Sequence, residues 1–180
     1  MTRANQNVIQ ELGGKPPLAQ LQELFPSLTP AEKMLIQRGL HVGRVINEYQ
    51  ERFGRGDFLI RNVIGADPDS GAMAIGDYVR TGQTVQFHVR DAASADEDLS
   101  LLLSQQQSGA SPPAGGLLFT CNGRGTRLFD QPHHDAALVR RFWNNLPLAG
   151  FFAQGELGPV GGKNFVHGFT ASLVLFSADV

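Results

Sequence analysis

The sequence has 180 residues, of which 42% are hydrophobic and 18% are charged, so we expect one folded domain with a core that needs no disulfide or metal. A net charge of −2 and a pI of about 6.2 argue against the basic surface of a nucleic-acid-binding protein. No apolar run approaches the roughly 20 residues of a membrane span, the first residues lack an apolar signal-peptide core, and Cys121 is the only cysteine. We therefore expect a cytoplasmic protein without nucleic-acid or membrane partners.

Two helices are predicted early in the chain. Residues 17–25 carry leucines at helical spacing after a proline suited to a first helical turn. Residues 27–39 begin with a helix-start signal, with Thr29 as the N-cap and Glu32 three residues later, and Gly39 is suited to end the helix.

Short alternating segments separated by turn residues predict an antiparallel sheet in the first half of the chain. The turns PDSG and RTGQ divide the longest part of this region, and their spacing is typical of a meander of consecutive strands. The expected strands are residues 7–12, 41–49, 58–67, 72–79 and 84–91.

The second half alternates helical and extended patterns. Residues 96–107 predict a helix with an acidic first turn, and residues 108–116 a low-complexity connector. Residues 116–121 are typical of a buried strand, and residues 130–143 of a helix with apolar i, i+4 pairs. Residues 147–156 and 165–176 predict two further strands. The chain, residues 1–180, is thus expected to be a single α+β domain with about eight strands, largely antiparallel, and about four helices.

Three segments carry a resemblance to a known family: LLFTCNGRGTRLF (117–129), HHDAALVRRF (133–142) and PLAGFFAQGELGPVGGKNFVHGFTASLVLF (147–176). Together with GDYVRTGQTVQFHVRD (76–91), they resemble the C-terminal half of FIST proteins, named for F-box and intracellular signal transduction.

The resemblance implies a small-ligand-binding sensory domain of bacterial signalling, often beside a kinase or cyclase output domain. It also implies that some members bind haem and sense nitric oxide. FIST proteins usually carry an N-terminal FIST half, which this chain lacks. We therefore expect that half, or a signalling output domain, as a partner.

The segment CNGRG (121–125) follows a predicted strand, and its glycines allow backbone N–H groups to point into one space and hold an anion. Asn122 lies within it, and Arg124 or Arg127 could add a charged hydrogen bond to a carboxylate or phosphate. The alternative is a tight turn without a ligand. Cys121 is either a buried structural thiol or a reactive one, and the second role would require a nearby base such as a histidine.

Histidines and acids mark two other places. His133, His134 and Asp135 stand at a predicted helix start, where we favour a role in helix capping over chelation. Glu156 is a lone acid among glycines and apolar residues, so if buried it must be paired or protonated. His167 lies in the last predicted strand and is either a hydrogen-bonded core residue or a ligand contact.

We predict that Cys121, Asn122, Arg124, Glu156, Asn164 and His167 line a pocket for a small polar ligand, such as an amino acid, with no cofactor and no catalysis. Arg124 would bind the anionic group of this ligand, and Glu156 the cationic one. The alternatives are a haem-based gas sensor, a cysteine-dependent enzyme and a module that binds only protein.

Overall fold

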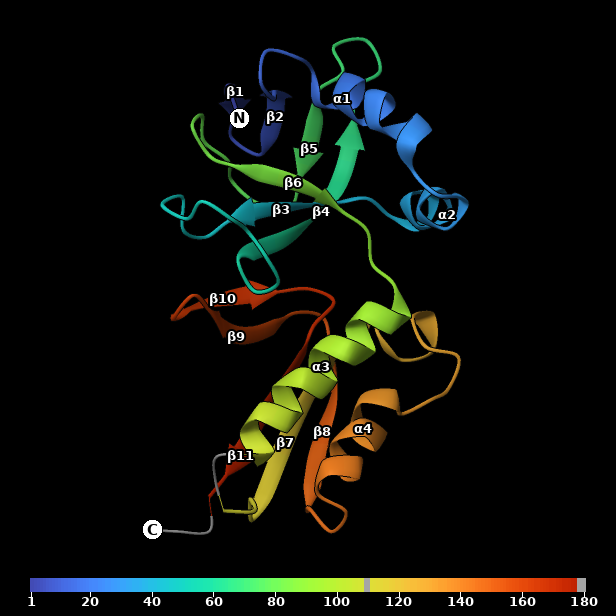
Figure 1. Cartoon of the computed structure of the whole chain (residues 1–180), viewed down its shortest axis with the longest axis vertical. Coiled ribbons are helices and arrows are strands. Elements are labelled where there is room, and N and C mark those ends of the chain that lie inside the picture. Colours follow the sequence, from blue (N-terminus) through green and yellow to red (C-terminus); the bar gives the residue numbers. More distant parts are fainter. Residues whose placement is uncertain (109–110, 178–180) are drawn as a thin grey trace. The chain divides into compact units, whose positions relative to one another are not determined.

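A computed structural model describes residues 1–108 and 111–177. These residues form an α+β structure with four α-helices and mostly antiparallel sheets, which confirms the predicted fold class (Figure 1). The chain divides into two compact units. Unit 1 consists of Met1–Arg90 and Val160–Gly162, and unit 2 of Asp91–Pro159 and Lys163–Val180. In the described part of the chain, no helix is both long and apolar enough to cross a membrane.

Unit 1 is built on a six-stranded sheet with the strand order β1-β2-β5-β4-β3-β6. Its strands pair in antiparallel fashion, and the sheet lies in the upper part of Figure 1. Its strands are β1 (Arg3–Asn5), β2 (Val8–Glu11), β3 (His41–Val45), β4 (Phe58–Ala66), β5 (Met73–Ile75) and β6 (Val85–His88). Each of the five strands expected in this region is therefore present, with shorter bounds.

The predicted meander is wrong at its last step. Strands β3, β4 and β5 are consecutive neighbours, but β6 crosses back to pair with β3, so that His41 lies opposite His88. This pairing puts Val85 and Phe87 against a buried cluster formed by Ile9, Leu12, Val42, Ile75 and Val79. Burial of apolar side chains, rather than order along the chain, thus selects the partner of β6.

Both helices predicted in unit 1 are present, with shorter bounds than expected. Helix α1 spans Pro17–Leu24 and helix α2 spans Pro30–Arg38. At the start of α2, the Thr29 side chain accepts the Glu32 N–H while the Glu32 carboxylate accepts the Thr29 N–H, so both halves of a capping box form.

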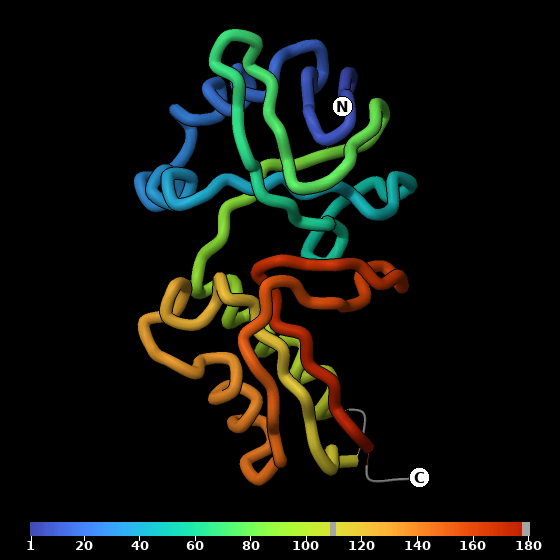
Figure 2. Tube along the Cα trace, turned by 180° about the vertical axis from the view of Figure 1, so that it is seen from behind, coloured from blue at the N-terminus to red at the C-terminus, as the bar shows by residue number. Residues whose placement is uncertain are grey.

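Unit 2 places two helices on one face of a three-stranded sheet. The strand order is β11-β7-β8, with β7 antiparallel to β11 and parallel to β8. Figure 1 shows the helices in front of these strands, and Figure 2 shows the strands from the opposite side. The elements are α3 (Ala92–Gln107), β7 (Gly115–Cys121), α4 (His134–Phe142), β8 (Leu148–Ala153) and β11 (Ala171–Phe176).

The core of unit 2 lies between this sheet and its helices. Leu99 and Leu103 of α3 pack with Leu138 and Val139 of α4 in one buried cluster, which also contains Leu146. Leu148, Leu173 and Leu175 from the sheet contact it.

Helix α3 begins four residues earlier than expected, because the Asp91 side chain accepts the Ser94 N–H and caps it. The predicted acidic first turn is therefore wrong, and the acidic run starting at Asp96 lies further along the helix. The predicted connector partly lies outside the described residues, at positions 109–110, and its last residues already belong to β7.

The segment after β8 contains more strands than the sequence predicts. Strands β9 (Glu156–Val160) and β10 (Lys163–His167) pair with each other. The single strand expected over residues 165–176 is divided into β10 and β11, because Phe169 has a φ of 65° and interrupts the extended backbone. The described residues therefore form eleven strands instead of about eight.

Candidate functional site

The end of strand β7 is fixed by backbone hydrogen bonds on both sides. The Cys121 N–H donates to the Thr170 carbonyl at 2.9 Å, and the Asn122 N–H donates to the Ala153 carbonyl at 2.8 Å. The next turn closes when the Arg124 N–H donates to the Cys121 carbonyl, also at 2.8 Å. Gly125 has a φ of 55°, a left-handed conformation that favours glycine. The CNGRG segment is thus a tight turn, and it leads into a short 3₁₀ helix, Gly125–Arg127.

The guanidinium of Arg124 is buried and paired with Asp135 at the first turn of α4. Its Nε donates to Asp135 Oδ2 at 2.8 Å, and its Nη2 donates to Oδ1 at 2.7 Å. The side chains are 7% and 4% exposed, respectively. Burial raises the pKa of the Asp135 carboxyl, but hydrogen bonds and charge from Arg124, together with His134, outweigh it and hold this pKa below its ordinary value. Asp135 is therefore an ionised partner of Arg124.

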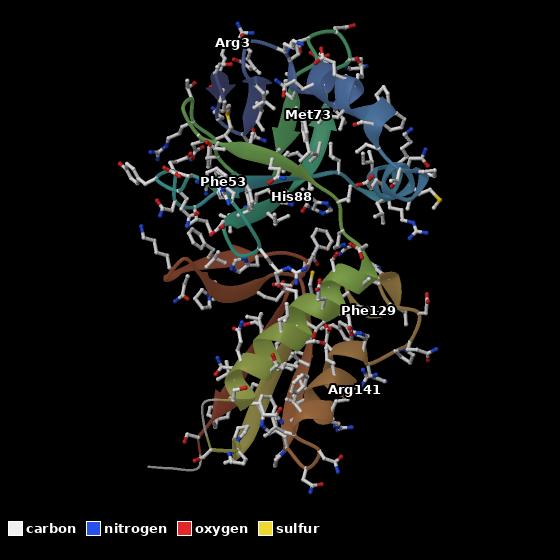
Figure 3. All side chains as sticks on the ribbon, in the orientation of Figure 1. Arg3, Phe53, Met73, His88, Phe129 and Arg141 are labelled. Atoms are coloured by element: carbon white, nitrogen blue, oxygen red, sulfur yellow. The ribbon has the colours of Figure 1, made fainter. Side chains whose placement is uncertain are left out.

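His134 extends this ion pair toward α3. Its Nε2 lies 2.8 Å from Asp96 Oδ1, and its Nδ1 lies 3.2 Å from Asp135 Oδ1. Its ring stacks on Phe129 with the centroids 3.5 Å apart, while the guanidinium of Arg124 lies 5.2 Å from the same ring. Phe129, labelled in Figure 3, thus contacts both the histidine and the arginine. The network joins the turn after β7 to α3 and to the start of α4.

Glu156 is the second buried charged group near the end of β7. It is 2% exposed, and its Oε2 accepts the Thr170 hydroxyl at 3.1 Å. Its Oε1 is also buried and has no hydrogen-bond partner among the described residues. The carbonyl of the same Thr170 accepts the Cys121 N–H, so Thr170 links Glu156 to Cys121.

The structure brings together only part of the predicted site. Cys121 and Glu156 meet through Thr170, and Arg124 follows Cys121 in the same turn. The side chains of Asn122 and Asn164, in contrast, are exposed. His167 is half-buried, and its Nε2 lies 2.9 Å from the Gly158 carbonyl. This contact engages one ring nitrogen within the β9–β10 pair.

Neither haem ligation nor thiol catalysis finds support in this geometry. The hydrogen bond to Gly158 occupies Nε2 of His167, so this atom does not fit an axial ligand. Cys121 Sγ accepts the Gly123 N–H at 3.4 Å, whereas His134 and His167 contact other groups. Among the described residues, no group of three or more His, Cys, Asp and Glu side chains is arranged to hold a metal ion.

Sequence reasoning missed two residues of this region. Thr170 has no signal beyond its place in the expected strand 165–176, and Phe129 has none beyond its place in the segment 117–129. Asp135 was assigned to helix capping, but its carboxylate binds Arg124 instead. An aspartate following an arginine-containing turn is a weak signal, because nothing in the spacing shows that the two side chains meet.

Two open hollows of about 250 and 450 Å³ occur in unit 1, and no predicted site residue lines either of them. The smaller is lined by Leu21, Gln22, Phe25, Pro26 and Ile36, from α1 to α2. The larger is lined by Gln6, Asn7, Ile64, Ile75, Gly76, Asp77 and Tyr78.

Comparison with known proteins identifies the family. The profile of the FIST C domain matches residues 17–159 of this sequence. The chain belongs to the FIST C domain family. An uncharacterized protein of Mycobacterium tuberculosis (strain H37Rv) is 52% identical over 177 residues, which are 98% of this chain and 46% of that protein. An uncharacterized protein of Mycobacterium bovis is 48% identical over 183 residues, which cover 100% of this chain and 47% of that protein.

A plant protein extends the FIST comparison. An F-box/LRR-repeat protein of Arabidopsis thaliana is 28% identical over 105 residues, which are 56% of this chain and 20% of that protein. This FIST C chain spans about half the length of the mycobacterial relatives that it matches.

Proposed function

We propose that this FIST C domain is the non-catalytic, ligand-binding part of an intracellular sensory protein. Unit 2 recognises a small polar molecule that carries an ammonium group, such as an amino acid. The observation that supports this proposal is the buried Glu156 carboxylate, whose Oε1 has no hydrogen-bond partner among the described residues. A donor from a ligand would satisfy this oxygen.

The energetics of Glu156 favour a cationic ligand group. A buried acceptor without a partner costs about 1 to 3 kcal/mol, and a buried charge costs more unless a counter-charge compensates it. An ammonium group supplies both a charge and hydrogen-bond donors, whereas the Thr170 hydroxyl supplies only one donor to Oε2. The affinity for the ligand would therefore arise largely from relieving this deficit.

Arg124 limits how the anionic end of the ligand binds. Its Nε and Nη2 are engaged by Asp135, so a ligand carboxylate would contact Arg124 through Nη1. The internal pair also compensates the charge of Arg124. We therefore expect the contact between the cationic group of the ligand and Glu156 to contribute more to binding than the contact between its anionic group and Arg124.

A ligand screen with a matched variant tests this proposal. The thermal midpoint of the wild-type chain is measured with the standard L-amino acids and with their decarboxylated amines at millimolar concentration. We expect at least one of these ammonium compounds to raise the thermal midpoint of the wild type. Glu156→Gln should weaken the binding of that compound at least about tenfold, a change of about 1.4 kcal/mol. Glu97→Gln, an exposed change on α3, should bind like the wild type.

Two results would count against the proposal. One is equal binding by Glu156→Gln and the wild type, which would place the ligand elsewhere. The other is the absence of any stabilising amine. Because Glu156→Gln preserves the volume of the side chain, we expect the variant to stay folded.

A further inference from the structure

The sheet of unit 2 has one apolar face that its helices do not cover. In the pairing register, Leu117 lies between Ala149 and Val174, Phe119 lies beside Phe151, and Gly115 lies opposite Phe176. Side chains alternate between the two faces of a strand, so these residues share one face. The uncovered face is defined by Leu117, Phe119, Ala149, Phe151, Val174 and Phe176. Ser172, which pairs with Phe119, also lies on this face, and its hydroxyl donates to the Leu157 carbonyl.

The opposite face of the sheet packs against the helices. Leu118 is buried, and Leu148, Leu173 and Leu175 contact the cluster formed with α3 and α4. Figure 2 shows the strands from the side opposite to Figure 1, where the helices lie in front. The two faces are therefore distinct, and only one of them is packed against α3 and α4.

Large aromatic and aliphatic groups on the uncovered face are open to solvent. Phe151 is 65% exposed, Val174 44% and Phe176 47%. The rings of Phe119 and Phe151 meet edge to face, with their centroids 5.1 Å apart. No charged residue is among the six that define the face. A sheet with one solvated face normally alternates apolar and polar residues, so two apolar faces are typical of a sheet buried on both sides.

The length of the relatives indicates what covers this face. This chain matches the mycobacterial relatives over almost all of its own length, but over only 46% and 47% of theirs. More than half of each relative is therefore additional polypeptide. A partner within the same chain is present at high effective concentration, and a charge-free apolar surface is typical of permanent rather than transient interfaces.

We propose that the uncovered face is a docking surface for additional polypeptide of the kind that makes up the rest of the mycobacterial relatives, which contributes a complementary apolar surface. A second copy of this chain and a transient protein partner are the competing occupants. The surface is distinct from Glu156 and its ligand, so this inference does not depend on the proposed function.

A chimera tests the inference directly. The segment of the M. tuberculosis relative that matches this chain is replaced by this chain, and Val174→Cys is introduced both in the chimera and in the 180-residue chain. The rate of labelling by a water-soluble maleimide then reports whether the face is covered. Gln105→Cys, an exposed position on α3, is the matched control, and protein without an added cysteine measures the background from Cys121.

We expect labelling at position 174 to be at least about tenfold slower in the chimera than in the 180-residue chain, a difference of about 1.4 kcal/mol in exposing the site. Labelling at position 105 should be equal in both. Equal rates at position 174 would overturn the inference.

Sedimentation of the 180-residue chain tests whether a second copy of the chain covers this face. We expect a monomer, because the proposed occupant is additional polypeptide and not a second copy of this chain. A dimer that Phe151→Glu converts to a monomer would overturn the inference and assign the face to self-association. Far-ultraviolet circular dichroism of each variant verifies that its fold is retained.

Discussion

Arg124 and Asp135 form a bidentate, buried ion pair that joins the turn after β7 to the first turn of α4. Each charge is compensated by the other, and the ring of Phe129 lies beside the guanidinium. Four predictions concern this pair and two other features of the two units.

Removing one partner of the ion pair should destabilise unit 2 strongly. Asp135→Ala leaves the Arg124 guanidinium buried without its counter-charge, and we expect it to lower the free energy of unfolding by about 3 to 5 kcal/mol. The double variant Arg124→Met/Asp135→Leu removes both charges and should lose less. Urea unfolding monitored by fluorescence of Trp143, the only tryptophan, measures the effect in unit 2. A loss below about 1 kcal/mol in Asp135→Ala would contradict the role given to the pair.

The same pair should make unit 2 sensitive to acid. The pKa of Asp135 is held below its ordinary value of 3.8: burial raises it, but the hydrogen bonds and charges of Arg124 and His134 prevail. A depressed pKa contributes stability above pH 3.8, and this contribution disappears as the pH falls through the folded-state pKa. Unfolding free energies measured below about pH 4 should therefore fall less steeply for Asp135→Asn than for the wild type. Equal slopes would show that Asp135 does not carry the effect.

Two facing histidines should make unit 1 sensitive at a higher pH. Burial lowers the pKa of both His41 and His88 from 6.5, and the charge of Arg90 adds to the effect at His41. Each histidine therefore contributes stability above pH 6.5 that is lost as the pH falls through its folded-state pKa. Amide exchange in β3 and β6, corrected for intrinsic rates, should show less protection at about pH 5.5 than at about pH 7.5.

His88→Leu, which cannot titrate, should reduce this difference in protection. His133→Asn, a change at an exposed histidine of unit 2, should preserve it. Protection in unit 1 that stays constant between the two pH values would be evidence against the prediction.

Gly150 should tolerate no side chain. A Cβ atom at this position would lie 1.8 Å from the Leu118 carbonyl oxygen and 2.7 Å from its carbon, both in the backbone of the paired strand β7. Since neither strand can move without breaking the β7–β8 pairing, we expect Gly150→Ala to cost at least about 4 kcal/mol. Gly168→Ala is the control, because no atom lies within 4 Å of its Cβ position. Similar urea midpoints for the two variants would refute this prediction.

The sequence predicts most elements because their signals are local. The capping box of α2 is readable from Thr29 and Glu32, since both hydrogen bonds form within one turn of helix. The β7 strand and the α4 helix are likewise found from apolar periodicity. The start of α3 was missed because Asp91 competes with the acidic run from Asp96 as a helix-start signal, and only the hydrogen bond to Ser94 distinguishes them.

The candidate site is less readable, because its contacts connect residues distant in the sequence. Cys121 and Glu156 were predicted to line one site, and Thr170 does link them, but the exposed side chains of Asn122 and Asn164 do not join the buried group. Nothing local distinguishes Thr170 from the other strand residues. Whether these residues bind a ligand stays a prediction.

The amino-acid sequence alone determined the capping box of α2, most of the strands and the family, because each depends on neighbouring residues or on a motif. Only the tertiary structure decided that β6 pairs with β3, that Phe169 divides the last strand, and that Asp135 binds Arg124. These outcomes depend on which distant surfaces bury apolar area and compensate charge together. That choice is made by the packing of the whole unit and is not encoded in any short segment.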